Sequence, residues 1–347
     1  MFPLFKNDHK PSVRLTNFQK ESIALLLKEI DKGKLKLVDN RCLCKNKDDN
    51  RDTILAEKDR FGIPVKSIIC SKCGLVRSSK VFDEAGQIDF YTHHYRNIYV
   101  GEADNKGSFY KDQYNRGKIL LDILRKTVDI RDIEKVVEIG CGAGGIMAPF
   151  HEAGFDCLGI DFDEDYLSFG IEKGLNLQKG DYQGLIKDNY ADVIILSHVM
   201  EHFTDPVKEM VGVVRKMAEG KYLVVEVPGI FNIDKSYFNP ILYLQNAHTY
   251  SFYFQFLKIF FEKLGLNVLF GNEKSVVILQ KPKGWIVPVL DEIYDESLSP
   301  YPQKISNYLY RTHVLYNLQL SPGLWKKRAG SILRIKKVKN KIRGLFT

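Results

Sequence analysis

The chain has 347 residues, of which 44% are hydrophobic and 27% charged, and its formal net charge at pH 7 is +8. These proportions are ordinary for a globular protein and exclude a low-complexity or collagen-like chain. No apolar run approaches the roughly 18 residues that suggest a membrane span, and the first residues lack the apolar core of a secretory signal. We therefore expect a soluble protein of the cytoplasm.

The first predicted element is a helix within residues 1–37. Four apolar residues between positions 23 and 30 recur at the 0-3-4-7 spacing of one helix face. Asn17 stands where an N-cap belongs, and Gly33 stands where the helix would end.

Residues 38–80 contain four of the six cysteines in two pairs, Cys42 with Cys44 and Cys70 with Cys73. Four thiolates can close a tetrahedral zinc site, and in a cytosolic chain this grouping favours metal over disulfides. Such a zinc ion would be structural, because the protein fills all four ligand positions. The alternative is four unconnected buried or free cysteines. A redox dithiol is disfavoured because CSKC lacks a thioredoxin-like βαβ context.

Residues 81–115 are rich in tyrosine, histidine and polar groups, and we interpret them as a connector with a short helix. Their aromatic side chains could form a lid with flat faces for a sugar, or could simply pack between two domains. The residues concerned are Tyr91, His93, His94, Tyr95 and Tyr99.

Between residues 116 and 285 short apolar runs alternate with segments of helix length. The runs are VVEIG, CLGID, ADVIILS and KYLVVEV. This alternation predicts an α/β domain whose parallel sheet is covered by helices on both faces. The later runs LNVLF and SVVIL are expected to pair as antiparallel strands at the sheet edge.

The run VVEIG leads into a glycine-rich turn, which lets a ligand lie against the backbone. Gly140, Gly142 and Gly145 satisfy the dinucleotide pattern GxGxxG, whereas Gly140, Gly142 and Gly144 satisfy the S-adenosylmethionine pattern GxGxG. The glycines alone do not decide between these cofactors. Glu138 favours S-adenosylmethionine, because a carboxylate repels a pyrophosphate but tolerates a sulfonium and an ammonium group.

Two further positions fit a nucleoside ligand. Asp161 ends the next strand, where a carboxylate can bind both ribose hydroxyls. Asp181 and Tyr182 follow a possible third strand, where they could accept from the adenine amine and cover the ring.

Four motifs in this order and spacing resemble those of class I S-adenosylmethionine-dependent methyltransferases. They are EIGCGAGG, GIDFDED, KGDYQGL and IILSHVMEHFTDP, and the resemblance covers about residues 116–280. It implies a Rossmann-like, seven-stranded sheet. It also implies that Glu138, Gly140, Gly142 and Gly144 hold the methionine portion, Asp161 the ribose, and Asp181 with Tyr182 the adenine, while Ser197 and His198 face the cleft.

The cysteine-containing segment and the motif FYTHHYRNIYVGE resemble the N-terminal part of methyltransferases from bacterial surface-polysaccharide and deoxysugar pathways. This resemblance extends from about 38 to 280. It implies a sugar substrate carried on a nucleotide or lipid diphosphate, and a structural zinc ion bound by the four cysteines.

Catalytic candidates are His248, His198 and Glu201. In zinc-containing sugar C-methyltransferases a Glu-His pair in the region of His248 supplies the base, but here Ala247 replaces the glutamate. We therefore expect O-methylation with His248 as the base. The alternative for His248 is capping or packing of the following helix. Glu201 and His202 recur in methyltransferases of differing chemistry, which favours a cleft-shaping role.

Residues 286–347 are expected to form a helical extension with a basic tail. Nine basic residues and no acidic residue lie between Lys326 and Arg343, so the rest of the chain is nearly neutral. Apolar residues recur among them, which fits an amphipathic helix on an anionic membrane, or else a solvated or disordered end. The near-neutral body disfavours nucleic acid as a partner.

The rival functions of the whole protein are sugar C-methylation, a non-catalytic scaffold in a glycan-assembly complex, and an RNA-binding methyltransferase.

Overall fold

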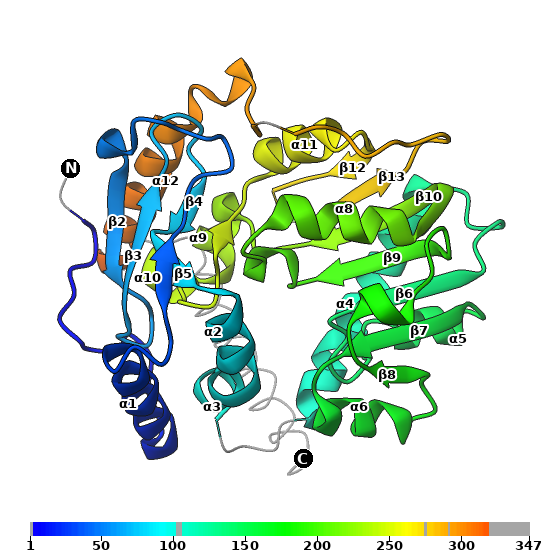
Figure 1. Cartoon of the computed structure of the whole chain (residues 1–347), viewed down its shortest axis with the longest axis horizontal. Coiled ribbons are helices and arrows are strands. Elements are labelled where there is room, and N and C mark those ends of the chain that lie inside the picture. The colour runs from blue at the N-terminus through cyan, green and yellow to red at the C-terminus, as the bar shows by residue number, and fades with distance from the viewer. Residues whose placement is uncertain (1–2, 102–105, 274–275, 291, 319–347) are drawn as a thin grey trace, which may run out of the picture.

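The computed structural model describes residues 3–101, 106–273, 276–290 and 292–318. Figure 1 shows two halves joined by short helices: a seven-stranded sheet with its helices, and a smaller β-module built around the N-terminal third of the chain. The predicted basic tail, residues 324–347, lies outside the described residues. Within them, no helix is both long enough and apolar enough to cross a bilayer.

The larger sheet confirms the predicted α/β domain. Its strand order is β12-β13-β10-β9-β6-β7-β8, and β13 runs antiparallel to both of its neighbours, β10 and β12. The edge pair β12 and β13 corresponds to the runs LNVLF and SVVIL. The strands are β6 (Lys135–Ile139), β7 (Asp156–Asp161), β8 (Leu177–Lys179), β9 (Ala191–Ser197), β10 (Met217–Glu226), β12 (Asn267–Gly271) and β13 (Val276–Gln280).

Side chains alternate between the two faces of the sheet, so neighbouring valines and isoleucines of one strand pack into the two cores on opposite faces. Val136, Val193 and Val224 pack under α4 and α5, whereas their successors Val137, Ile194 and Val225 pack under α8 and α11. The helices of this half are α4 (Lys106–Thr127), α5 (Ala148–Glu152), α6 (Glu164–Ile171), α7 (Tyr182–Leu185), α8 (Pro206–Lys216) and α11 (Phe254–Lys263). The short helices α9 (Ile233–Ser236) and α10 (Pro240–Tyr243) lie beside the smaller module (Figure 1).

The smaller module contains a four-stranded antiparallel sheet in the order β11-β4-β3-β2, with β1 paired to β5 beside it. Its elements are α1 (Asn17–Asp31), β1 (Leu37–Asp39), β2 (Thr53–Lys58), β3 (Pro64–Ile69), β4 (Val76–Ser78), β5 (Lys80–Phe82), β11 (Tyr250–Ser251) and α12 (Tyr301–Asn317). Strand β11 comes from the second half of the chain. The predicted boundaries at 38–80 therefore understate the module, because a strand from residue 250 and helix α12 complete it (Figure 1).

The predicted connector, 81–115, is mostly helical. It contains α2 (Glu84–Asp89), a π-helical stretch (Phe90–His94) and α3 (Tyr95–Tyr99). Helix α4 begins at Lys106, so the predicted start of the methyltransferase-like domain at 116 falls inside a helix. The structure thus moves that boundary toward the N-terminus.

The N-terminal helix is confirmed, but its predicted cap is wrong by one residue. Thr16, not Asn17, is the N-cap of α1: its side chain accepts from the Gln19 amide, and the Gln19 side chain accepts from the Thr16 amide, each at 3.1 Å. This reciprocal pair is a capping box, which needs Ser or Thr followed three residues later by Glu or Gln. Gly33 has a φ of +71° just after the helix, as expected.

Candidate active site and metal centre

The glycine turn follows β6 and meets the loop that follows β9. Gly140 and Gly144 have φ values of +74° and +71°. A Cβ on Gly140 would lie 2.5 Å from Val199 Cγ2, and one on Gly144 would lie 2.8 Å from Leu175 Cδ1. Both positions therefore require glycine for conformation and for space. The contact with Val199 places the turn next to His198 and Glu201.

Asp161 ends β7 beside this turn, as the sequence predicted. Its Oδ2 accepts from the Gly142 amide at 2.8 Å and its Oδ1 from the Asp163 amide at 2.9 Å. Burial raises the pKa of Asp161, and these two backbone hydrogen bonds act against that rise. The carboxylate is thus held by the turn itself. Its contact with a ribose stays a prediction.

Glu138 lies on β6 with 1% of its surface exposed, and its Oε2 has no hydrogen-bond partner within the part of the chain that the structure describes. Burial raises its pKa well above the ordinary value, and the nearby charge of Asp161 and then of Glu226 adds to that rise. Three carboxyl groups around one buried position favour a positively charged ligand. The ammonium and sulfonium groups of S-adenosylmethionine fit this position, and a pyrophosphate does not.

Ser197, at the end of β9, contacts Glu226, at the end of the neighbouring strand β10. Its hydroxyl donates to Glu226 Oε2 at 2.6 Å, and Arg116 Nη1 lies 3.7 Å from the same oxygen. Ser197 therefore lies beside the carboxyl groups that surround Glu138, at the carboxyl end of the strands where ligands of such sheets bind.

The structure differs from the prediction at Tyr182. Its ring is 6% exposed within the core, and its hydroxyl donates to the backbone oxygen of Glu209 on α8 at 3.2 Å. The ring therefore packs beneath α8 and presents no open face to an adenine. Asp181 is the N-cap of α7, where its side chain accepts from the Gln183 amide at 3.1 Å. Its role toward adenine stays a prediction.

A carboxylate surrounded by three histidines follows β9. We call Glu201, His198, His202 and His248 the Glu201 cluster. Glu201 Oε1 lies 3.2 Å from His198 Nδ1, 4.0 Å from His202 Nε2 and 3.9 Å from His248 Nε2. Burial alone would raise the pKa of Glu201, but the His198 hydrogen bond and the charges of the histidines hold it at about 2. The carboxylate is therefore ionised.

The three histidines differ in their access to solvent. The side chain of His198 is 34% exposed, that of His202 16% and that of His248 5%. Burial lowers the pKa of His248 well below its usual value, with the charge of His202 adding to the effect. His198 also has a φ of +56°, a conformation that is uncommon for a residue other than glycine and frequent at functional sites.

The β-module positions His248. Ser78 on β4 donates its hydroxyl to the His248 backbone oxygen and its amide to the Thr249 backbone oxygen, each at 3.1 Å, just before β11 adds to the sheet. Sequence reasoning missed this dependence. It named His202 as a cleft residue and Tyr91 as a lid residue, but it did not predict the contact between them. Spacing carries no signal of contacts between segments so far apart along the chain.

Part of the predicted aromatic lid lies over the Glu201 cluster. The hydroxyl of Tyr91 is 3.0 Å from His202 Nδ1, and the rings of Tyr91 and Tyr95 each lie edge-on to His202 with centroids 5.9 Å apart. Arg96 pairs with Asp163, which connects the helix to the loop after β7.

The remaining lid candidates lie differently. Tyr99 stacks on Tyr95 with ring centroids 4.6 Å apart. His94 is buried, with Nε2 2.8 Å from Glu29 of α1, and His93 is 62% exposed beside Asp89. His93 and His94 therefore do not belong to the group of side chains that lies over the Glu201 cluster.

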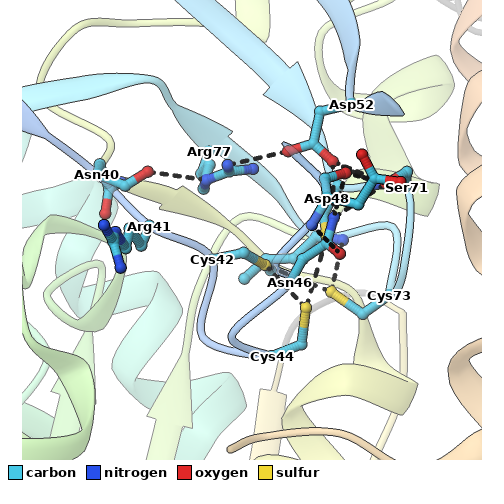
Figure 2. A network of polar contacts seen from close by, with 12 residues as sticks. Asn40, Arg41, Cys42, Cys44, Asn46, Asp48, Asp52, Ser71, Cys73 and Arg77 are labelled. Carbon is cyan, nitrogen blue, oxygen red and sulfur yellow. Dashed lines mark hydrogen bonds and ion pairs between the residues drawn. The ribbon is translucent and has the colours of Figure 1, made fainter. Parts of the chain in front are cut away.

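The four cysteines converge in one buried cluster. Sγ–Sγ distances are 3.5 Å for Cys42–Cys73, Cys42–Cys44 and Cys44–Cys70 (Figure 2). A tetrahedral ion bonded at about 2.3 Å holds its sulfurs about 3.8 Å apart, so the cluster fits zinc. All six cysteines fall within the described residues, and each is a free thiol. Hydrogen bonds from Cys42 and Cys44 lower the pKa of Cys70.

A polar network braces the two cysteine loops (Figure 2). Asp52 accepts from the Ser71 amide at 2.8 Å and from Arg77 Nη2 at 3.0 Å, and Arg77 Nε donates to the Asn40 backbone oxygen at 3.0 Å. Arg77 and Asp52 are nearly fully buried. Such a network orients the loops that carry the ligands, and Arg77 joins it to β4.

The strand order, the glycine turn and a carboxylate at the end of the next strand define a Rossmann-like sheet. A family model for a methyltransferase domain matches residues 111–269. This part of the chain is therefore similar to methyltransferase domains.

Individual relatives cover only parts of the molecule. An uncharacterized methyltransferase from Bacillus subtilis, YcgJ, is 30% identical over 115 residues, covering 30% of this chain and 46% of the relative. The chain thus spans about half the length of the curated relative that it matches. Among solved structures, a SAM-dependent methyltransferase from Archaeoglobus fulgidus is 21% identical with a TM-score of 0.39, covering 64% of this chain and 94% of that one. An O-methyltransferase family protein from Burkholderia thailandensis is 12% identical with a TM-score of 0.43, covering 55% and 63%.

Proposed function

We propose that the protein is an S-adenosylmethionine-dependent O-methyltransferase that acts on a sugar hydroxyl. The observation that carries this proposal is the pair formed by His198 Nδ1 and Glu201 Oε1, 3.2 Å apart beside the glycine turn. S-adenosylmethionine, when bound, supplies an electrophilic methyl group. Glu138, the glycine turn and Asp161 are the residues that would hold it.

His198 is better placed than His248 to remove a proton from the acceptor hydroxyl. His198 is the most exposed histidine of the Glu201 cluster, whereas His248 is buried. With Nδ1 bonded to Glu201, Nε2 is the nitrogen that accepts the proton. Glu201 fixes the orientation of the imidazole ring and stabilises the positive charge that the ring gains. We therefore assign the base to His198 and a positioning role to Glu201.

The proposal of a sugar acceptor is supported by a cavity of about 490 Å³ that reaches the surroundings of His202, although neither His198 nor the glycine turn lines it. Tyr91, Ala247 and Thr249 line it, and each of them also has a polar atom within hydrogen-bond distance of His202. The exposed side chains of Lys66 and Lys80 lie at its wall. A cavity of this size suits one sugar unit, and the lysines suit the phosphates of a nucleotide or lipid carrier. The proposed setting is surface-glycan biosynthesis in the cytoplasm.

Sugar C-methylation is the second candidate, and one observation favours it. Ala247 stands where a glutamate would precede His248, yet Glu201 Oε1 lies 3.9 Å from His248 Nε2. The fold therefore supplies a carboxylate that the local sequence lacks. Removing a proton from carbon is harder than from oxygen, and a histidine paired with a carboxylate is suited to that task.

The test is incubation of the full chain with methyl-labelled S-adenosylmethionine and a panel of nucleotide-linked sugars. We expect a label on oxygen, shown by mass spectrometry and NMR, and a loss of transfer in His198→Asn. A label on carbon, with exchange of the neighbouring hydrogen in D₂O, would favour the second candidate. Cofactor binding without transfer to any acceptor would favour a non-catalytic scaffold.

We also propose that the four cysteines bind one structural zinc ion, and that residues 324–347 contact anionic membranes. The 3.5 Å sulfur spacing supports the first, and the alternation of basic and apolar residues supports the second. Metal analysis of the purified protein tests the zinc. Binding of the full chain and of a chain ending at residue 323 to phosphatidylserine vesicles tests the membrane contact.

A further inference from the structure

We infer that Glu201, His202 and His248 form a binding site for a divalent transition-metal ion, separate from the four-cysteine cluster. One ligand atom from each of these residues lies within 4.8 Å of the other two. The carboxylate oxygen is 4.0 Å from His202 Nε2 and 3.9 Å from His248 Nε2. Ligands bonded at about 2.1 Å to one ion lie roughly 3 to 4 Å apart, so a small shift brings all three into contact with it.

The carboxylate provides an independent sign of a missing partner. Glu201 is 1% exposed, and its Oε2 is buried without a hydrogen-bond partner among the described residues. Buried polar atoms are nearly always satisfied, and a buried charge needs a partner most of all. Oε1 is the oxygen that faces His202 and His248, and it also contacts His198. An ion bound there would compensate the buried negative charge, and a small rotation of the carboxylate would bring Oε2 to the ion as well.

The backbone prepares His202 as a ligand. Its Nδ1 lies 2.9 Å from the backbone oxygen of Ala247. A carbonyl oxygen can only accept, so the proton of this ring resides on Nδ1 and the lone pair on Nε2, which is the nitrogen nearest Glu201. A histidine whose second nitrogen donates to a backbone carbonyl is the usual arrangement at protein metal sites. The Tyr91 hydroxyl, 3.0 Å from the same Nδ1, also keeps this ring in place.

His248 has one competing contact. The side-chain amide of Gln245 touches both ring nitrogens of His248. Entry of an ion therefore requires the Gln245 amide to rotate, and the rotated amide can present its carbonyl oxygen as a fourth ligand. Two imidazoles and one carboxylate suit Zn²⁺, Mn²⁺, Fe²⁺ or Co²⁺ better than Mg²⁺, which prefers oxygen ligands.

The site also contacts the residue proposed as the base. Tyr91, Ala247 and Thr249 separate His202 from the cavity described above. A bound ion would instead fix the Glu201 carboxylate, which lies 3.2 Å from His198, and so would help to orient His198. This role rests on the proposed function, whereas the binding of the ion does not.

The experiment is a calorimetric titration of the full chain with Mn²⁺, after the protein has been purified with zinc and dialysed against a weak chelator. Mn²⁺ competes poorly for thiolates, so the cysteine cluster keeps its own metal. We expect one Mn²⁺ per chain, with at least tenfold weaker binding in Glu201→Gln and in His202→Ala. His151→Ala, which removes an exposed histidine of α5, is the matched control and should bind normally.

Circular dichroism and S-adenosylhomocysteine binding verify that each variant is folded. If Glu201→Gln fails to fold, His202→Ala alone decides the result. Absence of Mn²⁺ and Zn²⁺ binding, or equal Mn²⁺ affinity in wild type and folded His202→Ala, overturns the inference. Methyl transfer is scored separately: transfer by protein that binds no second metal leaves the proposed function standing, and metal binding without any transfer leaves the metal site standing.

Discussion

The four-cysteine cluster and the Glu201 cluster are both buried groups of potential metal ligands, but they are assembled in different ways. The cysteines come from two short turns of one module, and three pairs of their sulfur atoms lie 3.5 Å apart. The Glu201 cluster joins the loop after β9 to a segment more than 40 residues later, and Glu201 Oε2 has no hydrogen-bond partner in the described ranges of the chain. A filled tetrahedral site supports structure, whereas an incomplete and partly exposed site can act on a ligand.

The two clusters are also connected. Arg77 of the network around the cysteines belongs to β4, and β4 holds the backbone of His248 and Thr249 through Ser78. The cysteine module therefore does more than stabilise its own fold, because it positions one member of the Glu201 cluster. Loss of metal from the first cluster should consequently impair the second.

The largest effect is expected from Cys70→Ser. Structural zinc contributes on the order of 10 kcal/mol of binding free energy to a small module, so the variant should lose its zinc and unfold the module. Atomic absorption and thermal unfolding measure both changes. Cys157→Ala, which alters a cysteine of β7 outside the cluster, should keep its zinc; if Cys70→Ser also keeps it, the cluster does not bind zinc.

His198→Asn should reduce kcat by about 100-fold to 10,000-fold, the contribution typical of a general base. Asparagine tolerates the positive φ of this position better than alanine, so the fold should be preserved. S-adenosylhomocysteine affinity, measured by calorimetry, should be unchanged. His93→Asn is the matched control, and activity near wild type in His198→Asn would assign the base elsewhere.

Asp161→Ala should weaken S-adenosylhomocysteine binding by about 10-fold to 100-fold. The carboxylate organises the glycine turn through Gly142 and is placed to accept from ribose, and hydrogen bonds to charged groups contribute about 1.5–3 kcal/mol. Glu164→Gln, an exposed position on α6, should bind normally. Unchanged calorimetric affinity in Asp161→Ala would remove Asp161 from the cofactor site.

The smallest predicted effect is a pH dependence of cofactor binding that comes from Glu138. Its pKa is raised well above the ordinary value by burial and by the charges of Asp161 and Glu226. A cationic ligand stabilises the carboxylate and lowers that pKa, so binding should release protons, and affinity should fall several-fold as the pH falls. Calorimetry in buffers of different ionisation enthalpy measures the release. Glu138→Gln should abolish it, and proton uptake by the wild type would contradict this account.

Local signals along the chain were enough to predict several elements of this fold. Strands with apolar runs, the glycine turn, Asp161 at a strand end and the two cysteine pairs were all predicted, because spacing along the chain directly sets side-chain direction and backbone geometry. The N-cap of α1 was missed by one residue only, since the capping box at Thr16 is also a local pattern.

Contacts between groups far apart along the chain became known from the packing of the folded protein. It placed β11 on the cysteine module, buried Tyr182 beneath α8, and brought His248 to Glu201 despite the alanine at 247. None of these contacts follows from spacing, because each depends on how two separately formed surfaces pack. The exposure of His198 and the burial of His248 follow from that packing, and exposure is what distinguishes a base that can reach a substrate from one that cannot.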